Sequence, residues 1–381
     1  MARLKVDPDV QFIRDLQAAG GESLKKCYQC ATCSVICPLS PEENPFPRKE
    51  MIWGQWGLKD KLVNDIDIWL CHNCGECSDL CPRGASPGDV LAALRNMAYR
   101  SLAKPAVIGK WLSSAKYLPI LFAIPALIYL IIWGFTTGLS IPEGEIVFGK
   151  VFPGDYTIDP VFGLVAIFVL FTFASAIGNL FKSFKESGYT PKEDAPSFWK
   201  SLLDVIKEEI VTHSKFQKCS SNAERYKGHL FLFYGFVALF IVTSIVAVGH
   251  WGGRLIGHEM HTPLALWNPV KILANVGAIL LIAGLVLITR MRLNADPSKS
   301  VSSYYDWYLL GVIWAVALTG ILSEILRLAN VAALAYTAYY LHLISVFMLI
   351  AYLPWTKLAH LVYRTVALAY ARQIGRKGLG E

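Results

Sequence analysis

The sequence contains little charge for its length. Only 17% of its 381 residues are Asp, Glu, Lys or Arg, whereas 54% are hydrophobic and the mean hydropathy is +0.41. These values exclude an ordinary soluble protein of this size. The sequence also has weak strand signals, no low-complexity segment and no evident nucleotide-binding fingerprint. We therefore expect an all-α membrane protein.

Cysteine is scarce outside two short segments. Eight of the nine cysteines occur in two copies of the spacing C-x2-C-x2-C-x3-C-P, at residues 27–38 and 71–82. This is the bacterial-type ligand pattern of the [4Fe–4S] cluster, and in two-cluster proteins the fourth cysteine of each run ligates the other cluster. The predicted ligand sets are Cys27, Cys30, Cys33 and Cys81 for one cluster, and Cys71, Cys74, Cys77 and Cys37 for the other.

Zinc and disulfides are the alternatives for these cysteines. Zinc sites usually present cysteines in separated pairs and do not need the third cysteine that follows each pair here. Disulfides need an oxidising compartment, and no secretory signal precedes the runs. The ninth cysteine, Cys219, has no partner at ligand spacing and is interpreted as structural. His72, inside the second run, is expected to tune a cluster or to face solvent.

Long apolar runs are confined to the sequence after Lys116. Six stretches there are long enough to cross a bilayer as helices. Tryptophans and tyrosines gather near their ends, as they do at membrane interfaces. The predicted spans are Tyr117–Leu139, Val161–Phe181, Leu230–Gly249, Trp267–Ile288, Tyr305–Leu326 and Ala333–Pro354.

The sequence divides into four parts on this basis. We assign 1–102 to a two-cluster domain, 103–116 to a basic linker, 117–364 to a six-span domain with an interfacial segment at 184–228, and 365–381 to a basic tail. Lysine and arginine concentrate in alternate connections, so the positive-inside rule places both termini and both clusters in the cytoplasm, with the spans in the inner membrane. These loops, facing membrane lipid, explain the net charge of +7. No nucleic-acid partner is needed.

Four of the eight histidines lie near the ends of two predicted spans. His229 and His360 fall on the cytoplasmic side, and His250 and His342 fall on the outer side. Eighteen residues separate His342 from His360, a rise of about 27 Å that returns to the same helix face. Two antiparallel helices can hold cofactors between facing side chains. We predict an inner haem b between His229 and His360 and an outer haem b between His250 and His342, with plain interfacial histidines as the alternative.

Several other polar residues near the spans have two interpretations. His258 or His261 could supply the outer ligand instead. Glu324 ends the fifth span on the outer side, where it could relay protons at a quinone site or simply pair with Arg327. His213 is interpreted as a surface residue of the interfacial segment.

Three short motifs and the fusion of the two parts carry a resemblance to known proteins. The cysteine runs resemble the iron–sulfur C subunit of heterodisulfide reductase. The spans resemble the b-type cytochrome of that enzyme and, more distantly, the nitrate reductase gamma subunit. The two parts in one chain resemble the membrane C subunit of the quinone-interacting membrane-bound oxidoreductases (Qmo) of sulfate reducers. The motifs are His213-x2-Phe216-x2-Cys219, Arg225-x2-Gly228-His229 and Thr319-Gly320-x3-Glu324-x2-Arg327.

The resemblance implies two haems b, a menaquinone site, soluble flavin and iron–sulfur partner subunits A and B, and electron exchange with adenylylsulfate reductase. The expected fold is a helical two-[4Fe–4S] ferredoxin-like domain fused to a six-helix transmembrane cytochrome b bundle. The expected function is electron transfer between menaquinol and the cytoplasmic partner complex. The alternatives are a membrane subunit of a heterodisulfide reductase and an anchor without haem. The first of these needs a further cysteine-rich site, and only Cys219 is left over.

Overall fold

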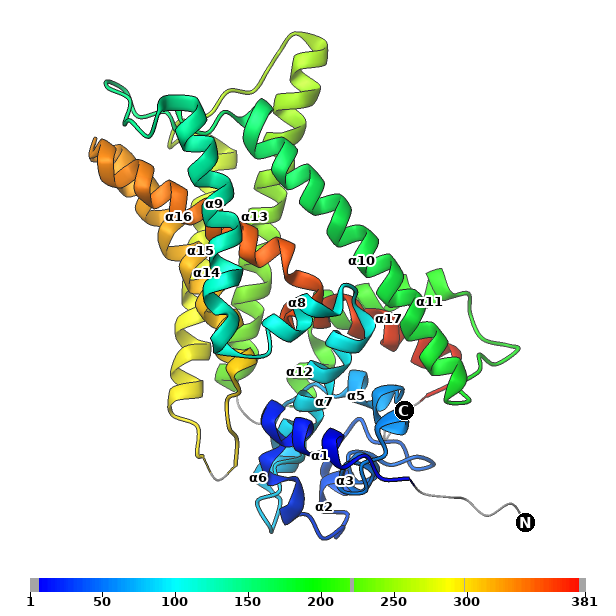
Figure 1. Ribbon diagram of the computed structural model, residues 1–381. Coiled ribbons are helices and arrows are strands. Elements are labelled where there is room, and N and C mark those ends of the chain that lie inside the picture. Colours follow the sequence, from blue (N-terminus) through cyan, green and yellow to red (C-terminus); the bar gives the residue numbers. More distant parts are fainter. Residues whose placement is uncertain (1–6, 220–222, 298, 377–381) are drawn as a thin grey trace.

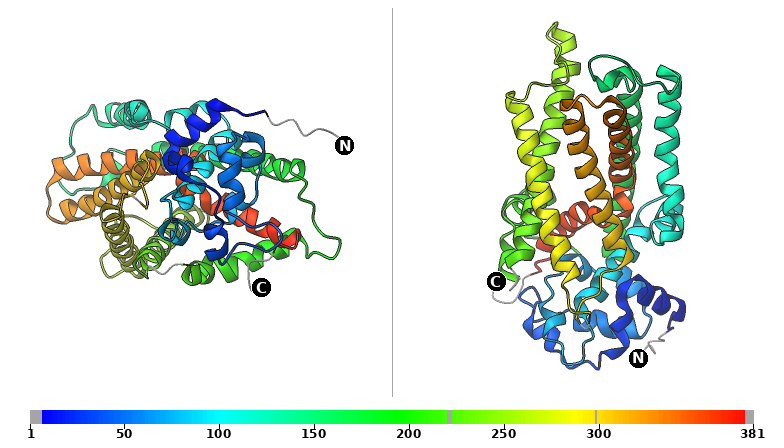
Figure 2. Two further views of the ribbon diagram at one scale, coloured as in Figure 1. Left: turned by 90° about the horizontal axis from the view of Figure 1, so that it is seen from below. Right: turned by 90° about the vertical axis from the view of Figure 1, so that its left-hand side faces the viewer.

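The computed structural model of the chain describes residues 7–219, 223–297 and 299–376. Every regular element in these ranges is a helix, which confirms the predicted all-α fold. Figures 1 and 2 show a group of short helices from the N-terminal third beneath a bundle of long helices. The cysteine runs and the histidines therefore come from two parts of the molecule that meet along one boundary.

Short helices build the N-terminal part. The longest of them, α7, begins at Pro87, a residue favoured in the first turn of a helix. Its face with Val90, Leu91 and Leu94 is buried against the other helices. The helices are α1 (Val10–Leu16), α2 (Thr32–Ile36), α3 (Arg48–Gln55), α4 (Lys59–Val63), α5 (Asp67–Leu70), α6 (Glu76–Asp79) and α7 (Pro87–Leu102).

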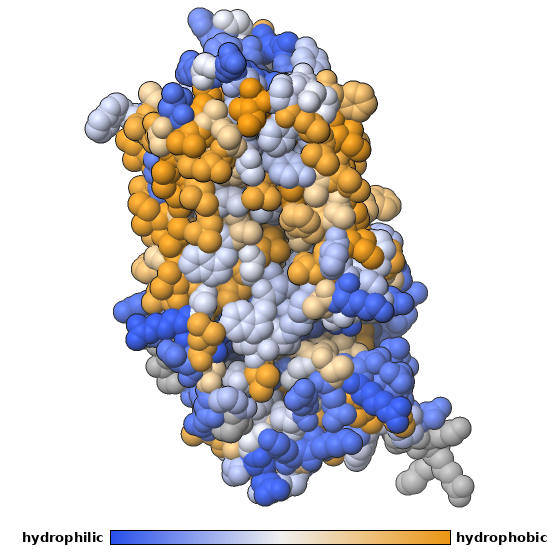
Figure 3. Space-filling model, turned by 60° about the vertical axis from the view of Figure 1, so that its left-hand side comes forward, coloured by the Kyte–Doolittle hydropathy of each residue, from blue (hydrophilic) through white to orange (hydrophobic). Residues whose placement is uncertain are grey.

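Six long helices follow, and each is long and apolar enough to span a membrane, as the sequence predicts. Figure 3 shows their surface as an apolar belt between polar ends. Local signals fix several helix ends: the Asn268 side chain caps α14, and Ser303 and Asp306 form a capping box at the start of α15. The six helices are α9 (Leu118–Thr137), α10 (Asp159–Glu186), α13 (Ala223–Ile256), α14 (Pro269–Leu293), α15 (Tyr304–Leu328) and α16 (Ala332–Ala351).

Four shorter helices lie where the two parts meet. The last of them, α17, falls largely within the segment predicted as a basic tail. It is nevertheless buried at Tyr363, Val366 and Tyr370, and it contacts α5, α10 and α11. These four helices are α8 (Ala106–Trp111), α11 (Phe198–Val205), α12 (Ser214–Cys219) and α17 (His360–Gln373).

The chain changes direction between α16 and α17. Helix α16 ends at Ala351, Pro354 lies in a short 3-10 segment, and α17 begins at His360. Figure 2 shows α17 running across the bundle below α16. The expectation that His342 and His360 share one helix face is therefore wrong. The physical reason is that proline removes a backbone donor and its ring clashes with the preceding turn.

The boundary between the two parts is closely packed. Trp69 from α5, Tyr99 from α7 and Tyr363 from α17 are fully buried, and their ring centroids are 5.6, 5.5 and 5.7 Å apart. Such aromatic contacts add to the free energy gained by burying their surface. Arg376, near the C-terminus, pairs with the buried Asp67 of α5. The N-terminal part is thus anchored to the last segment of the chain as well as to the spans.

Helices α13 and α14 pack backbone against backbone through glycines. A Cβ atom on Gly235 would lie 2.8 Å from a backbone nitrogen of α14, and one on Gly284 would lie 2.7 Å from a backbone nitrogen of α13. Small residues permit this close approach of helices in a membrane. The packing also positions a candidate ligand, because Gly228, in the same contact, directly precedes His229.

Replacing Gly235 by leucine should force α13 and α14 apart. Overpacking of this kind costs about 1–3 kcal/mol. We expect Gly235→Leu to lower the Tm of the detergent-solubilised protein by several degrees, measured by thermal unfolding. Gly163→Leu in α10 is the matched control, because a Cβ atom there meets nothing within 4 Å. Equal Tm values for the two variants would contradict the close packing.

Candidate redox sites

The two cysteine runs fold in the same way. In each run the third cysteine lies in a short helix and is buried, Cys33 in α2 and Cys77 in α6. A residue with left-handed backbone precedes each helix, Ala31 with φ 71° and Gly75 with φ 100°. This conformation turns the chain tightly, so that the cysteines before the helix curl back toward the one within it. Helices α2 and α6 contact each other, so the two runs form one unit.

The first predicted set of cysteines lies together. Burial raises the pKa of the Cys33 thiol to about 12, and the charges of three neighbouring thiolates add to this effect. These neighbours are Cys27, Cys30 and Cys81. Cys81 belongs to the second run, so the structure brings a fourth cysteine across to the first run.

The second set is assembled in the same crossed manner. Burial raises the pKa of the Cys77 thiol well above its usual value, and the nearby thiolates of Cys71, Cys74 and Cys37 add to this. These four cysteines also line one small pocket, together with apolar side chains such as Leu39, Phe46 and Leu91. Cys37 comes from the first run, which mirrors the arrangement of the first set.

The sulfur atoms are too far apart for a single zinc ion. Four thiolates bound to zinc at about 2.3 Å lie roughly 3.8 Å from one another. Among the residues that the structure describes, no three cysteine sulfurs lie within 4.8 Å of one another. A cubane cluster spaces its thiolates more widely and supplies the positive charge that buried thiolates need. The cysteines therefore fit two [4Fe–4S] clusters.

His229 and His360, the predicted inner pair, face each other at the boundary. Their ring centroids are 6.1 Å apart. Nδ1 of His360 donates to the carbonyl oxygen of Lys357 at 2.7 Å, and Nδ1 of His229 lies 2.9 Å from Nε2 of His213. Among the described residues, no hydrogen bond engages either Nε2 atom, so both can bind a metal. Two imidazoles bound to one iron at about 2 Å have ring centres roughly 6 Å apart, so the pair fits a bis-histidine haem.

The environment of His360 keeps its ring in the form that binds a metal. Burial lowers the pKa of His360 to about 4, and the nearby positive charge of Arg364 acts in the same direction. The ring is therefore neutral at physiological pH, and neutral imidazole is the ligand form.

His213 was expected at the surface, and that expectation is wrong. Only 7% of its surface is exposed. Its ring lies against Phe233 at 5.0 Å between centroids and reaches the ring of His229. A hydrogen bond to the second nitrogen of a ligating histidine fixes its orientation and raises its basicity. The motif that contains His213 drew attention to it, but no local pattern shows that it reaches α13.

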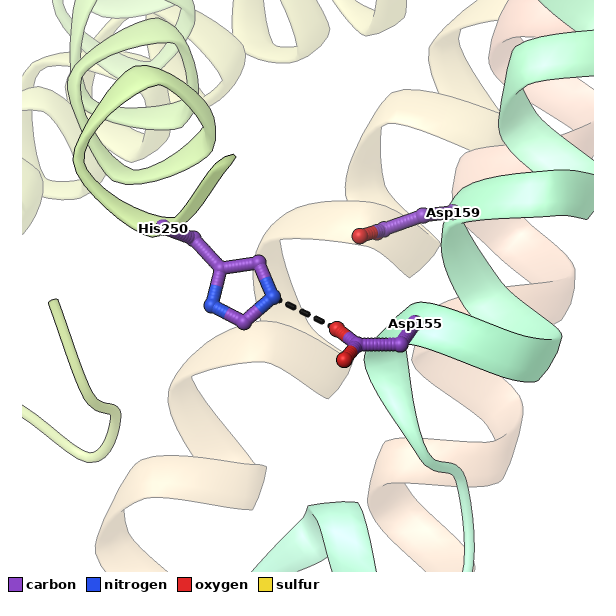
Figure 4. Close-up of side chains that lie close together, drawn as sticks. All are labelled: Asp155, Asp159 and His250. Carbon is purple, nitrogen blue, oxygen red and sulfur yellow. Dashed lines mark hydrogen bonds and ion pairs between the residues drawn. The ribbon is translucent and has the colours of Figure 1, made fainter. Parts of the chain in front are cut away.

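His250, predicted for the outer haem, is held by carboxylates. Its Nε2 lies 2.5 Å from Oδ1 of Asp155 (Figure 4), and its Nδ1 lies 2.9 Å from Oε1 of Glu259. Because both ring nitrogens are engaged, neither is free for iron in this arrangement. His258 and His261, the alternative ligands, are exposed.

His342 stands apart from His250, and no ring contact joins them. Nδ1 of His342 lies 3.1 Å from the carbonyl oxygen of Val316 and 3.2 Å from the hydroxyl of Thr319. Gly320 makes room for the ring, because a Cβ atom there would lie 3.0 Å from it. The Thr-Gly pair of the third motif is thus explained by its contact with His342. The structure brings the inner pair of histidines together and leaves the outer pair separate.

Glu324 pairs with Lys271 and not with Arg327. Its Oε2 lies 2.7 Å from the Lys271 ammonium, and each side chain is 21% exposed. Glu324 is one turn beyond Gly320 on α15, so it lies on the helix face that meets His342. This ion pair is at the end of the spans opposite the cysteine runs (Figure 1).

Two arginines tie the helices of the inner histidines to the second cysteine run. Arg364, one turn after the α17 histidine, donates to the Trp69 carbonyl oxygen at 3.1 Å and to the His72 ring at 2.8 Å. Arg225, one turn before the α13 histidine, donates to the Cys74 carbonyl oxygen at 3.0 Å. Charge-assisted hydrogen bonds of this type are among the stronger ones in proteins. The second cysteine set is therefore the one nearer to the inner histidines.

His72 and Phe216 lie between the second cysteine set and His229. His72 follows Cys71, and its ring stacks on Phe216 with a centroid distance of 6.0 Å and an interplanar angle of 11°. The ring of Phe216 lies 5.6 Å from that of His229. A continuous row of side chains thus leads from the second cysteine set to the inner histidine pair. The role of Phe216 could not be found from the sequence, because its contacts come from distant segments.

The fold and the cysteine sites define a multi-pass membrane protein of the iron–sulfur electron-transfer class. A family model described as a 4Fe-4S dicluster domain matches residues 23–85, which supports the predicted clusters. A second model, described as citrate utilization protein B, matches residues 115–378. That match covers more than half of the chain, and the chain belongs to this family.

Curated relatives of the chain are subunits of heterodisulfide reductases. The C subunit of the H(2):CoB-CoM heterodisulfide,ferredoxin reductase of Methanothermobacter marburgensis is 37% identical over 94 residues, which is 24% of this chain and 50% of the relative. One of the CoB–CoM heterodisulfide reductase iron-sulfur C subunits of Methanocaldococcus jannaschii is 36% identical over 107 residues, 26% of this chain and 57% of the relative. The chain spans about half the length of these relatives. No solved structure matches the chain.

The comparisons confirm one part of the resemblance noted from the sequence. The N-terminal part is similar to the iron–sulfur C subunit of heterodisulfide reductase. A further example is a protein of Archaeoglobus profundus that is described as like this subunit, 36% identical over 88 residues, 23% of this chain and 45% of the relative. The relation of the spans to b-type cytochromes stays a prediction.

Crossed ligation predicts which cysteine variants share a defect. Cys81→Ala should remove the same cluster as Cys27→Ala, although Cys81 belongs to the other run, and Cys37→Ala should remove the same cluster as Cys71→Ala. We expect each variant to lose about half of the bound iron and one of two EPR signals of the reduced protein. If Cys81→Ala instead shared its EPR defect with Cys71→Ala, the ligand sets would be uncrossed.

Proposed function

We propose that this chain is the membrane subunit of a quinone-linked oxidoreductase complex. It carries electrons between menaquinol or menaquinone and a soluble partner through haem b and two [4Fe–4S] clusters. The observation that carries the proposal is the His229–His360 pair next to the second cysteine set, in which no described residue forms a hydrogen bond with either Nε2 atom. A membrane anchor without haem would not need two half-buried, facing histidines supported by further hydrogen bonds.

His229 and His360 are the residues that would hold the haem. Bound there, it would supply a one-electron carrier inside the boundary between the spans and the iron–sulfur domain. His213 and the Lys357 carbonyl hold the two rings in their orientations. A second haem on the outer side would be held by His342 and would need a second ligand other than His250, because Asp155 and Glu259 engage both ring nitrogens of His250.

The electron route follows the row of side chains across the boundary. It leads from His229 along Phe216 and His72 to Cys71 of the second set. The second set is therefore the cluster site nearer to the spans, and the first set is the cluster site farther from them. Arg364 and Arg225 keep the two sides at a fixed separation and place positive charge beside a centre that gains negative charge on reduction.

The quinone is assigned to the end of the spans opposite the clusters. Oxidation of menaquinol releases two electrons and two protons. Ionisable residues within a span are costly and usually functional, and His342 and the Glu324–Lys271 ion pair are such residues at that end. Glu324 is our candidate proton acceptor, with His258 as an alternative. Both termini lie in the cytoplasm in this proposal, so electrons move inward while protons leave on the outer side.

The partner performs the substrate chemistry. Eight of the nine cysteines are taken by the two predicted cluster sets, which leaves no cysteine-rich site for a disulfide substrate on this chain. We propose soluble flavin and iron–sulfur subunits as the partner, serving adenylylsulfate reduction. A heterodisulfide reductase complex, named for the curated relatives, and a citrate-linked oxidoreductase, named for the family, are the competing partners. The subunits that co-purify with the chain distinguish the three.

Removal of either inner histidine should abolish the haem. We expect His229→Leu and His360→Leu to lose the b-type α-band in the reduced-minus-oxidised spectrum and to lose haem reduction by a menaquinol analogue. His261→Leu, which changes an exposed histidine, is the control and should keep both. His250→Leu should keep the inner haem as well. Absence of an α-band in the carefully purified wild type would eliminate the haem and leave the anchor as the explanation.

Disruption of the aromatic row should slow electron transfer without removing cofactors. We expect the double variant His72→Leu, Phe216→Leu to bind haem and both clusters but to reduce its clusters several-fold more slowly after quinol is added. Stopped-flow absorbance of the haem and freeze-quench EPR of the clusters measure the two steps separately. Phe240→Leu, at a side chain that is 73% exposed on α13, is the control. Unchanged cluster reduction in the double variant would move the route elsewhere.

A further inference from the structure

We propose that His250, Asp155 and Asp159 bind a divalent transition-metal ion, for which Zn²⁺ is the probe. The site lies at the end of the spans opposite the cysteine runs, where α10 begins and α13 ends (Figure 1). The inference goes beyond the proposed function and does not depend on it. None of the three residues belongs to the clusters, the inner haem or the quinone site assigned above.

The three side chains bring a mixed set of ligand atoms together. A ring nitrogen of His250 and one carboxylate oxygen from each aspartate all lie within 4.8 Å of one another (Figure 4). Zinc binds imidazole nitrogen and carboxylate oxygen at about 2.0–2.2 Å, which places the atoms of a tetrahedral site roughly 3.3 Å apart. Side-chain rotations of the order of 1 Å therefore bring these atoms to ligand distances.

Two elements from different parts of the sequence supply the ligands. Asp155 lies in the short helical segment Gly154–Ile158, and Asp159 is the first residue of α10. The two aspartates are separated by about one helical turn, so both carboxylates reach the same side. Helix α13 presents His250 to them from the opposite side (Figure 4). A bound ion would therefore join the ends of α10 and α13.

The second nitrogen of the imidazole is held by the loop that follows α13. The N–H of Met260 donates to the carbonyl oxygen of Gly249 at 3.0 Å, and Gly253 leaves room for the returning loop, because a Cβ atom there would collide with its backbone. Glu259 is thereby placed with Oε1 at 2.9 Å from Nδ1 of His250. Metal-binding histidines usually donate their other N–H to a carboxylate in this way, which orients Nε2 toward the metal.

A small ion suits this site, although a haem does not. The porphyrin fills the four equatorial positions of a haem iron, so a carboxylate cannot bind beside the histidine. Asp155, at 2.5 Å from Nε2 of His250, would then compete with the iron. A free zinc ion has adjacent positions for both atoms and keeps a further one for water. The imidazole ligand favours a transition metal over Mg²⁺ or Ca²⁺, which prefer oxygen.

The charges of the site match a divalent ion. Three carboxylates gather here, those of Asp155, Asp159 and Glu259, and Arg254 pairs with one of them at 2.6 Å. With a neutral imidazole, the group therefore has two negative charges in excess, which one divalent cation balances. The side chains of His250 and Asp155 are 24% and 22% exposed, so an ion can reach them from solvent.

Zinc binding to the full-length protein in detergent tests the proposal. The protein is treated with a chelator and dialysed against Zn²⁺, and bound zinc and iron are measured by mass spectrometry. We expect His250→Ala and Asp159→Asn to bind one zinc ion fewer per chain than the wild type. Glu143→Gln, which changes an exposed carboxylate in the connection before α10, is the matched control and should bind as much as the wild type.

Two further measurements locate the ion. X-ray absorption of the bound zinc should show nitrogen and oxygen ligands at about 2.0–2.2 Å. Because the ion joins two helices only in the folded protein, zinc should raise the Tm of the wild type and of Glu143→Gln, but not that of His250→Ala. The haem spectrum and the EPR signals of the clusters show that each variant has kept its cofactors.

Three results would overturn the proposal. Equal zinc content in the wild type and His250→Ala would place the ion elsewhere, and so would an equal rise in their Tm values. Sulfur ligands in the absorption spectrum would assign the zinc to cysteines. Loss of a haem from His250→Ala would make this histidine a haem ligand. None of these measurements depends on quinol, so the proposed function can fail while the metal site stands.

Discussion

The arrangement of the molecule depends on hydrogen bonds from two arginines to the segment that carries the second cysteine run. Arg225 and Arg364 each lie one turn from an inner histidine, on different helices. Arg225 donates to the Cys74 carbonyl oxygen, and Arg364 donates to the Trp69 carbonyl oxygen of α5 and to the His72 ring. The two guanidinium groups therefore set the distance and the angle between the spans and the iron–sulfur domain. Everything else at the boundary packs around that geometry.

A second set of charges holds the outer edge of the same boundary. Glu50, Asp65 and Asp67 are buried within reach of one another, and Lys49 and Arg376 pair with them. Burial and the neighbouring Asp65 raise the pKa of Glu50 well above its usual range. Lys49 and Arg376 offset negative charge in this cluster. A buried group of this kind contributes little net stability but tolerates only one arrangement of its members, which favours a single relative position of the two parts.

The sequence allowed the local features to be predicted and not the long-range ones. The crossed cysteine sets follow from the C-x2-C-x2-C-x3-C-P spacing, which is typical of proteins with two clusters. The six spans follow from the length and composition of the apolar stretches. The sequence predicts the pairing of His229 with His360 only because both residues fall on the cytoplasmic side of the membrane. The helical argument for His342 and His360 failed because Pro354 ends α16 and α17 takes a different direction. The surroundings of His213 and His250 come from other segments of the sequence, so only the folded chain shows that His213 contacts His229 and that His250 is bound by carboxylates.

The placement of α17 determines the order in which the protein can be assembled. The cysteine runs precede all six spans in the sequence, whereas His360 and Arg364 follow the last span. The N-terminal part can thus begin to fold while later spans are still being inserted, as domains generally fold during synthesis. The inner histidine pair cannot form until α17 has left the ribosome and moved beneath the spans. A chain that stalls before α17 would therefore contain both cysteine sets but would lack the His229–His360 pair.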